Sequence, residues 1–146
     1  MSTTDLQLPE GAPAEVITKA LLRDIDLRAF GFSGSLALIT LDNGHDHNRP
    51  NTFGAQSLLA LDAAITDALS RKPAAIAITG KPFIFAAGAD LSALAFISTR
   101  EQSLAIGKLG HDVFRRLGEI DIPTFAFING LALGCGLEVA LHCTYR

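Results

Sequence analysis

Basic residues do not outnumber acidic ones in this sequence: 12 Lys and Arg stand against 15 Asp and Glu, for a formal net charge of −3. A chain without a basic excess has no field to hold a phosphate backbone, so nucleic acid is not an expected partner, and anionic membranes are disfavoured too. The apolar runs are all broken before about 20 residues, the length needed to span a bilayer as a helix. The N-terminal segment lacks the basic stretch and apolar core of a secretory signal. We therefore expect neither a membrane span nor an export signal.

Cysteine is scarce, with two residues, Cys135 and Cys143. They fall on one predicted helix, where their spacing in the sequence corresponds to about 12 Å at the usual rise per residue. That distance is too long for a disulfide. We therefore predict free thiols and a reducing, cytoplasmic location.

Apolar residues, by contrast, are abundant: 49% of the 146 residues are hydrophobic, and the mean hydropathy is +0.32. This content is enough to bury a core, and one globular domain is the default for a chain of this length. Residues 1–14 are rich in Thr, Pro, Gly and Ala and predict a flexible leader. The folded part is therefore expected to cover residues 15–146.

The hydrophobic pattern alternates between strands and helices. Strands are predicted at residues 16–27, 35–41, 74–79 and 124–128, and helices at residues 57–70, at residues 99–117 and in the last segment, which contains Glu138. The first two strands suit a hairpin, whereas the last two are apolar enough to be parallel strands buried on both faces. The second helix has Thr99 as a candidate N-cap, and its predicted inward-facing residues are Leu104, Ile106, Leu109, Val113, Phe114 and Leu117. This order predicts an α/β architecture with right-handed crossovers.

Two loops interrupt the pattern where a strand leads into a helix, which is where α/β sheets usually bind ligands. Small residues at 86–89 allow a ligand to approach the backbone closely, and Gly134 and Gly136 flank Cys135 at the predicted start of the last helix. Backbone N–H groups that converged from both loops would form an oxyanion hole, which stabilises an enolate. Glu138 would lie about one turn further along that helix, within reach to move a proton.

Each of these features also has a purely structural interpretation. The small-residue loop suits a tight turn, Asp90 suits a helix N-cap, and the glycines around Cys135 suit a close approach of helix and strand. Glu138 is a carboxylate in an apolar segment, where a charge is costly unless it is paired or functional. Pairing with His142 and a favourable position near the helix N-terminus both remain open for Glu138.

Three other candidates are weaker. The His45–His47 stretch offers adjacent metal ligands, but it lies in a turn-forming loop and no second cluster completes a metal site. Residues 134–136 are similar to the opening of a dinucleotide-binding fingerprint, yet the third glycine is missing. Cys135 would need a basic partner to act as a nucleophile, and neither His111 nor His142 is well placed. We therefore predict no metal and no cofactor in this segment.

Two stretches resemble the signatures of a known family. FIFAAGADLSAL (residues 83–94) and INGLALGCGLEVAL (residues 128–141) are similar to the first and second signatures of the crotonase, or enoyl-CoA hydratase/isomerase, superfamily. The resemblance runs over residues 17–146. The segments LITLDNGHDHNRPNTFG and EVALHCTYR look most like the N-terminal hydratase region of multifunctional fatty-acid β-oxidation proteins. The resemblance implies an α/β fold, a crotonase-like repeated ββα spiral truncated before its C-terminal turns and helices.

The resemblance also implies roles for the matching residues. The Ala89 and Cys135 N–H groups occupy the positions that donate to the thioester oxygen, and Glu138 matches the first of two glutamates that handle water and a proton in the hydratases. The implied reaction is hydration of trans-2-enoyl-CoA through an oxyanion-stabilised thioester enolate. A raised pKa of Glu138 in a water-poor pocket would suit this work. The implied substrate-binding residues are Ala87, Gly88, Asp90, Leu91 and Gly134.

Departures from the family pattern at two places bear on the reaction. Cys135 replaces the usual glycine, although only its backbone N–H would be used. The second glutamate would lie beyond Arg146, so we expect a fragment that is inactive alone and whose parent is the enzyme, a lyase. The alternatives are an enoyl-CoA isomerase, another enolate-forming crotonase and a non-catalytic acyl-CoA-binding module. For the parent, the resemblance implies a downstream NAD-dependent 3-hydroxyacyl-CoA dehydrogenase domain and a homo-oligomer or β-oxidation complex.

Overall fold

The computed structural model describes residues 11–146, without the side chains of residues 93–95. Strands and helices alternate along the chain, as expected for the α/β class. Most of the predicted leader, residues 1–14, lies outside the described residues. The elements are β1 (Lys19–Asp26), η2 (Leu27–Phe30), β2 (Ser35–Asp42), α1 (Ala55–Ser70), β3 (Ala75–Gly80), β4 (Phe83–Ala86), η3 (Leu91–Phe96), α2 (Arg100–Glu119), β5 (Thr124–Phe127), β6 (Gly130–Ala132) and α3 (Cys135–His142).

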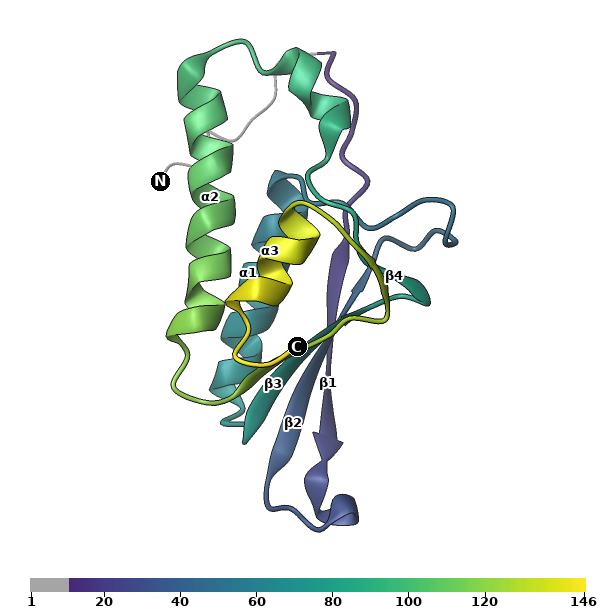
Figure 1. Ribbon diagram of the computed structural model, residues 1–146. Helices are drawn as coiled ribbons and strands as arrows, with labels where there is room; N and C mark the ends of the chain where they lie inside the picture. The colour runs from purple at the N-terminus through teal and green to yellow at the C-terminus, as the bar shows by residue number, and fades with distance from the viewer. Residues whose placement is uncertain (1–10) are drawn as a thin grey trace.

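Four strands form the main sheet in the order β1-β2-β3-β5. β1 and β2 pair antiparallel, which confirms the predicted hairpin. β2, β3 and β5 run parallel, so a crossover must return the chain between β2 and β3 and again between β3 and β5. α1 supplies the first crossover and α2 the second, and α2 packs beside both α1 and α3 (Figure 1).

The core lies between the helices and the sheet. α1 buries Leu58, Leu61 and Ile65, because residues spaced three or four apart share one face of a helix. They join Ile76 and Ile78 of β3, which are fully buried in the middle of the sheet. Ala77, which points to the opposite face of the sheet, is fully buried too, so the predicted burial of β3 on both faces is confirmed.

The N-terminus of α1 is capped by a residue that is distant in the sequence. Its N-cap, Gly54, makes no side-chain hydrogen bond. The Glu15 carboxylate instead accepts hydrogen bonds from the Gln56 and Ser57 N–H groups, each at 2.8 Å, and from the Ser57 hydroxyl at 2.5 Å. Residues before β1 thereby satisfy free N–H groups at the start of α1.

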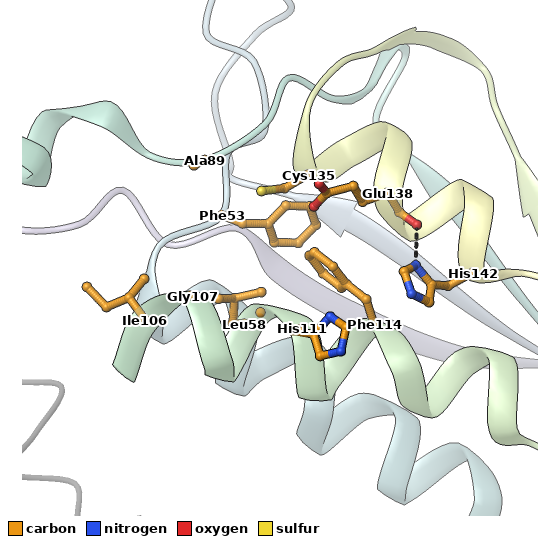
Figure 2. A pocket seen from close by; sticks show the side chains of 11 residues that line it. Phe53, Leu58, Ala89, Ile106, Gly107, His111, Phe114, Cys135, Glu138 and His142 are labelled. Atoms are coloured by element: carbon orange, nitrogen blue, oxygen red, sulfur yellow. Dashed lines mark hydrogen bonds between the residues drawn. The ribbon is translucent and has the colours of Figure 1, made fainter. Parts of the chain in front are cut away.

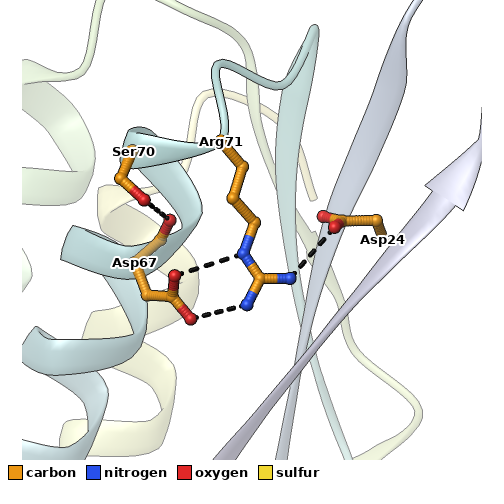
Figure 3. Close-up of polar contacts among 4 residues, drawn as sticks. All are labelled: Asp24, Asp67, Ser70 and Arg71. Atoms are coloured by element: carbon orange, nitrogen blue, oxygen red, sulfur yellow. Dashed lines mark hydrogen bonds and ion pairs between the residues drawn. The ribbon is translucent and has the colours of Figure 1, made fainter.

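The C-terminal end of α1 is joined to β1 by an arginine. Arg71 donates to Asp67 one turn earlier, at 2.6 and 3.2 Å, and to Asp24 of β1 at 2.9 Å (Figure 3). The guanidinium holds the pKa of Asp67 below its usual value, and the two carboxylates raise the pKa of Arg71. Because all three side chains are more than a third exposed, this group contributes modestly to stability.

A second sheet of two short parallel strands, β4 and β6, was not predicted. With these two strands, the chain contains two successive strand–strand–helix units, β3-β4-α2 and β5-β6-α3, although the sequence shows no internal repeat. Asn129 ties the units together, since its amide donates to the carbonyls of Gly80 and Lys81 at 2.9 and 2.8 Å. The parallel pairing sets the carboxyl ends of β4 and β6 at the same edge.

Two predictions of burial are wrong. β5 is not buried on both faces: Phe127 is 48% exposed, because β5 is the last strand of the sheet and Tyr145 alone bridges it there within the described residues. Leu104 is 58% exposed, since it lies in the N-terminal half of α2, whereas the buried residues Val113, Phe114 and Leu117 lie in its C-terminal half. Thr99 caps this helix as predicted, in a capping box with Gln102.

Within residues 11–146, none of the helices combines the length and the hydrophobicity needed to cross a bilayer.

Candidate active site

The two predicted loops meet at the edge formed by β4 and β6. A Cβ atom placed on Gly134 would lie 3.4 Å from the Cα atom of Gly88, and one placed on Gly88 would lie 3.4 Å from the Leu133 carbonyl. Both glycines have positive φ angles, 47° for Gly134 and 114° for Gly88, which other residues adopt at a cost. Glycine at these positions therefore serves close backbone contact between the loops.

The first loop is held by residues that precede α1. The Ala87 N–H donates to the Asn51 carbonyl at 2.8 Å. Phe53 then continues the pairing, because its N–H donates to the Gly88 carbonyl at 2.8 Å and its carbonyl accepts from the Asp90 N–H at 2.9 Å. The N–H between them, that of Ala89, donates no hydrogen bond to any described residue.

Asn51 is a positioning residue that the sequence did not reveal. Its side chain is fully buried and donates to the carbonyls of Leu41 at 2.8 Å and Phe85 at 3.1 Å, next to the ends of β2 and β4. A buried amide is favourable only where such partners exist. Because these partners are distant in sequence, no local sequence pattern predicts that Asn51 has a positioning role.

The second loop delivers the other N–H group. Cys135 is the first residue of α3, and its N–H finds no acceptor among the described residues, as expected for a first-turn position. Gly136 packs against β4 so closely that a Cβ atom would lie 2.1 Å from the Ala86 carbonyl. The structural interpretation of this glycine, close approach of helix and strand, is therefore confirmed.

A cavity of about 390 Å³ lies in front of both loops. It brings together the three residues that the sequence selected for chemistry, Ala89, Cys135 and Glu138, with α2 forming the opposite wall (Figure 2). Its volume is within the range of small-molecule sites. The lining residues are Phe53, Leu58, Ala89, Ile106, Gly107, Gly110, His111, Phe114, Cys135, Glu138 and His142.

The other predicted substrate-binding residues do not line this cavity. Ala87, Gly88 and Gly134 form the loop backbones behind it. Asp90 is half-buried and its carboxylate accepts from the Ser92 N–H at 3.0 Å and the Ser92 hydroxyl at 2.7 Å, so it caps the turn that leads into η3. Leu91 is 68% exposed. A direct contact of these residues with substrate stays a prediction.

The surroundings of Glu138 differ from the expectation. The residue is exposed, so the water-poor pocket expected around it is wrong: α2 faces it across an open cavity. His142 does not pair with its carboxylate either. A ring nitrogen of His142 lies 2.8 Å from the Glu138 main-chain carbonyl, as Figure 2 shows.

The Cys135 thiol lies beside Glu138 and is half-buried. Burial raises the pKa of this thiol, and the negative charge of Glu138 and a hydrogen bond to its carboxylate raise that pKa further. A raised pKa leaves little of the nucleophilic thiolate at neutral pH. The structure thus provides no activation of Cys135 as a nucleophile.

The His45–His47 stretch belongs to a loop folded around a buried ammonium group. Lys81 is 5% exposed, and its Nζ donates to the Asn43 side chain at 2.5 Å and to the carbonyls of His45, Asp46 and Arg49 at 2.8, 2.9 and 2.6 Å. Over the described part of the chain, no three His, Cys, Asp or Glu side chains are grouped to hold a metal ion.

The sequence model described as enoyl-CoA hydratase/isomerase matches residues 31–146. The chain therefore belongs to the enoyl-CoA hydratase/isomerase family. Among curated proteins, it is 37% identical over 113 residues to the fatty acid oxidation complex subunit alpha of Shewanella amazonensis, covering 76% of this chain and 16% of that protein. The predicted resemblance to this family and its multifunctional members is confirmed.

Solved structures share the fold of this chain. DspI of Pseudomonas aeruginosa matches with a TM-score of 0.66 at 31% identity, over 84% of this chain and 46% of its own. An enoyl-CoA hydratase/isomerase from Xanthobacter autotrophicus Py2 is similar in fold, with a TM-score of 0.73 at 24% identity, over 88% of this chain and 45% of its own. The crotonase-like fold is thereby confirmed, and this chain spans about half the length of these structures.

Proposed function

We propose that this chain supplies the oxyanion hole and the first acid–base carboxylate of an enzyme that adds water to trans-2-enoyl-CoA. The observation that carries the proposal is the convergence of the Ala89 N–H, the Cys135 N–H and the Glu138 side chain on one cavity. Neither N–H has an acceptor among the described residues, so both are free to bind a ligand oxygen.

The chemistry follows from this arrangement. Water adds through its oxygen to Cβ of the enoyl thioester, the double-bond electrons move onto the thioester oxygen, and a proton is then delivered to Cα. The Ala89 and Cys135 N–H groups stabilise the negative oxygen of the intermediate enolate. Glu138 moves a proton between water and substrate, and its exposure gives water access to the carboxylate.

The family supports a role in fatty-acid β-oxidation, because the Shewanella relative is named as the alpha subunit of a fatty acid oxidation complex. This chain spans 16% of that relative, so we place it in a multifunctional β-oxidation protein as part of the same proposal. The CoA thioester is the substrate, and NAD belongs to a further domain.

An enoyl-CoA isomerase is the second candidate. Glu138 is the one carboxylate among the described residues that line the cavity. Isomerisation requires a base that removes a proton from one carbon and returns it to another, which one carboxylate accomplishes, whereas hydration is expected to use a second glutamate. The two functions share the enolate and the oxyanion hole.

Glu138→Gln tests the proposal. Binding of crotonyl-CoA is measured on this chain, and hydration is measured on the full-length gene product from the loss of enoyl-thioester absorbance. We expect binding to be unchanged and hydration to fall by about 100-fold or more, the usual effect of losing a general acid–base.

Glu119→Gln is the matched control, because Glu119 is exposed on α2 and lies outside the cavity. Unchanged hydration in Glu138→Gln would remove Glu138 from the mechanism. If the unmodified protein isomerises enoyl-CoA but does not hydrate it, and Glu138→Gln loses that isomerisation, the function is that of the isomerase. Absence of crotonyl-CoA binding would reject both functions.

A further inference from the structure

Two glycines in the interior of α2, Gly107 and Gly110, have no explanation in the packing of the protein itself. Glycine is among the least favourable residues in a helix interior. A Cβ atom at Gly107 would meet no atom within 4 Å, and one at Gly110 would make an ordinary contact with Leu58 at 3.6 Å. Neither position therefore needs glycine for close approach, in contrast to Gly136, where a Cβ atom would collide with backbone.

Both glycines line the cavity of the candidate site. Side chains at these positions would fill part of that cavity, which faces Ala89 and Glu138 on its other side. The surrounding wall is largely apolar: Ile106 and Phe114 of α2 line it, and the Phe114 ring faces Phe53 (Figure 2). The two missing side chains thus leave room for an apolar ligand beside the reacting groups.

We propose that Gly107 and Gly110 determine acyl-chain length, by leaving space along α2 for the tail of a thioester longer than butyryl. This inference rests on the proposed acyl-CoA function and adds the substrate class, medium-chain rather than short-chain thioesters. The apolar tail lies against α2 while the thioester oxygen meets the N–H groups across the cavity. Each methylene that the cavity buries strengthens binding by about fourfold.

The experiment compares the dissociation constants of butyryl-CoA and decanoyl-CoA for this chain by calorimetry. The unmodified chain is expected to bind decanoyl-CoA at least about tenfold more tightly, as buried methylenes require. Gly107→Leu and Gly110→Leu are expected to abolish that preference by weakening decanoyl-CoA binding more than butyryl-CoA binding, because the longer tail loses more space.

Gly118→Leu is the matched control, since Gly118 lies on the same helix and outside the cavity. It is expected to keep the preference for decanoyl-CoA. Gly107→Ala adds a single methyl group where no atom is near, so it keeps the inference testable if a leucine variant fails to fold. It is expected to raise the melting temperature, because alanine favours helix, and to weaken decanoyl-CoA binding selectively.

Different results would overturn the chain-length assignment and the acyl-CoA function. An unmodified chain that binds both thioesters equally, or Gly107 and Gly110 variants that keep the preference, would overturn the assignment of chain length and leave the acyl-CoA function standing. An unmodified chain that binds neither thioester would overturn the proposed function, and the chain-length inference with it.

Discussion

At the scale of single residues, Cys135 contributes a backbone N–H to the candidate site while its side chain is kept unreactive. The thiolate is the reactive form of cysteine, and both burial and the neighbouring carboxylate raise the pKa of this thiol. Cys143 is more strongly affected, because burial raises its pKa to about 11. The two cysteines are therefore expected to persist as free thiols.

Glu138→Gln is expected to make Cys135 more reactive. The substitution removes the negative charge that opposes ionisation, so the thiol pKa falls and the pH profile of alkylation by iodoacetamide moves to lower pH. Burial remains, and the profile stays above that of a free cysteine. Peptide mass spectrometry measures both cysteines in one sample, with Cys143 as the internal control. An identical Cys135 profile in the two proteins would contradict the influence of Glu138.

At the scale of elements, the start of α1 depends on Glu15. Glu15→Ala is expected to lower the free energy of unfolding by about 1 kcal/mol, because N–H groups of the first turn lose their acceptor. Urea denaturation measures the change. Glu119→Ala, at an exposed position on α2, serves as the control and is expected to change stability by less than about 0.5 kcal/mol.

A double-mutant cycle with Gly54 sharpens this prediction. A Cβ atom at Gly54 would lie 2.4 Å from the Glu15 carboxylate, so Gly54→Ala is expected to destabilise the protein by displacing the cap. In the Glu15→Ala background that collision is absent, and the same substitution should be nearly neutral. Additive effects of the two changes would show that Glu15 does not cap the helix in solution.

How far an element was predictable depended on where its partners lie. The helix around Leu58, Leu61 and Ile65 and the Thr99 cap follow from local spacing, and the structure has both. β4 and β6 have four and three residues, too few to show an alternating pattern, and they exist because each pairs with the other across the sequence.

The candidate site, too, was predictable only where the evidence is local in the sequence. Ala89, Cys135 and Glu138 were selected from their motifs, and they line one cavity. The exposure of Glu138 was not foreseen, because the facing wall comes from α2, and neither was the role of Asn51, whose partners lie on other elements. The residues of a motif can be identified from the local sequence. Their solvent exposure, and the residues that hold them in place, depend on the tertiary structure.

At the scale of the whole molecule, the C-terminal elements expose an apolar surface. Large side chains between 40% and 54% exposed gather on β5, β6, α3 and the residues that join and follow them: Phe127, Ile128, Leu131, Leu133, Leu137, Leu141 and Tyr145. Exposed apolar side chains that adjoin one another promote association or aggregation. The apolar residues of β3, in the middle of the main sheet, are buried by contrast.

Leu137→Lys combined with Leu141→Lys is expected to reduce self-association of this chain. Both leucines are exposed, so the free energy of unfolding should change by no more than about 0.5 kcal/mol. Sedimentation velocity over a range of protein concentrations measures the effect. Leu21→Lys, at a 50% exposed position on β1, is the control and should leave association unchanged. Equal association of all three proteins would place the self-contact elsewhere.

The loop around Lys81 is, in the language of coordination chemistry, an oxygen cage whose cationic guest is tethered to the host. Oxygens of Asn43, His45, Asp46 and Arg49 surround Nζ at 2.5–2.9 Å. Lys81→Ala removes the guest and the carbons beside it and leaves the donors, so the melting temperature of that variant should rise with added ammonium chloride more than with sodium chloride. The melting temperature of the unmodified chain should respond equally to the two salts, because the Lys81 ammonium group already occupies the site.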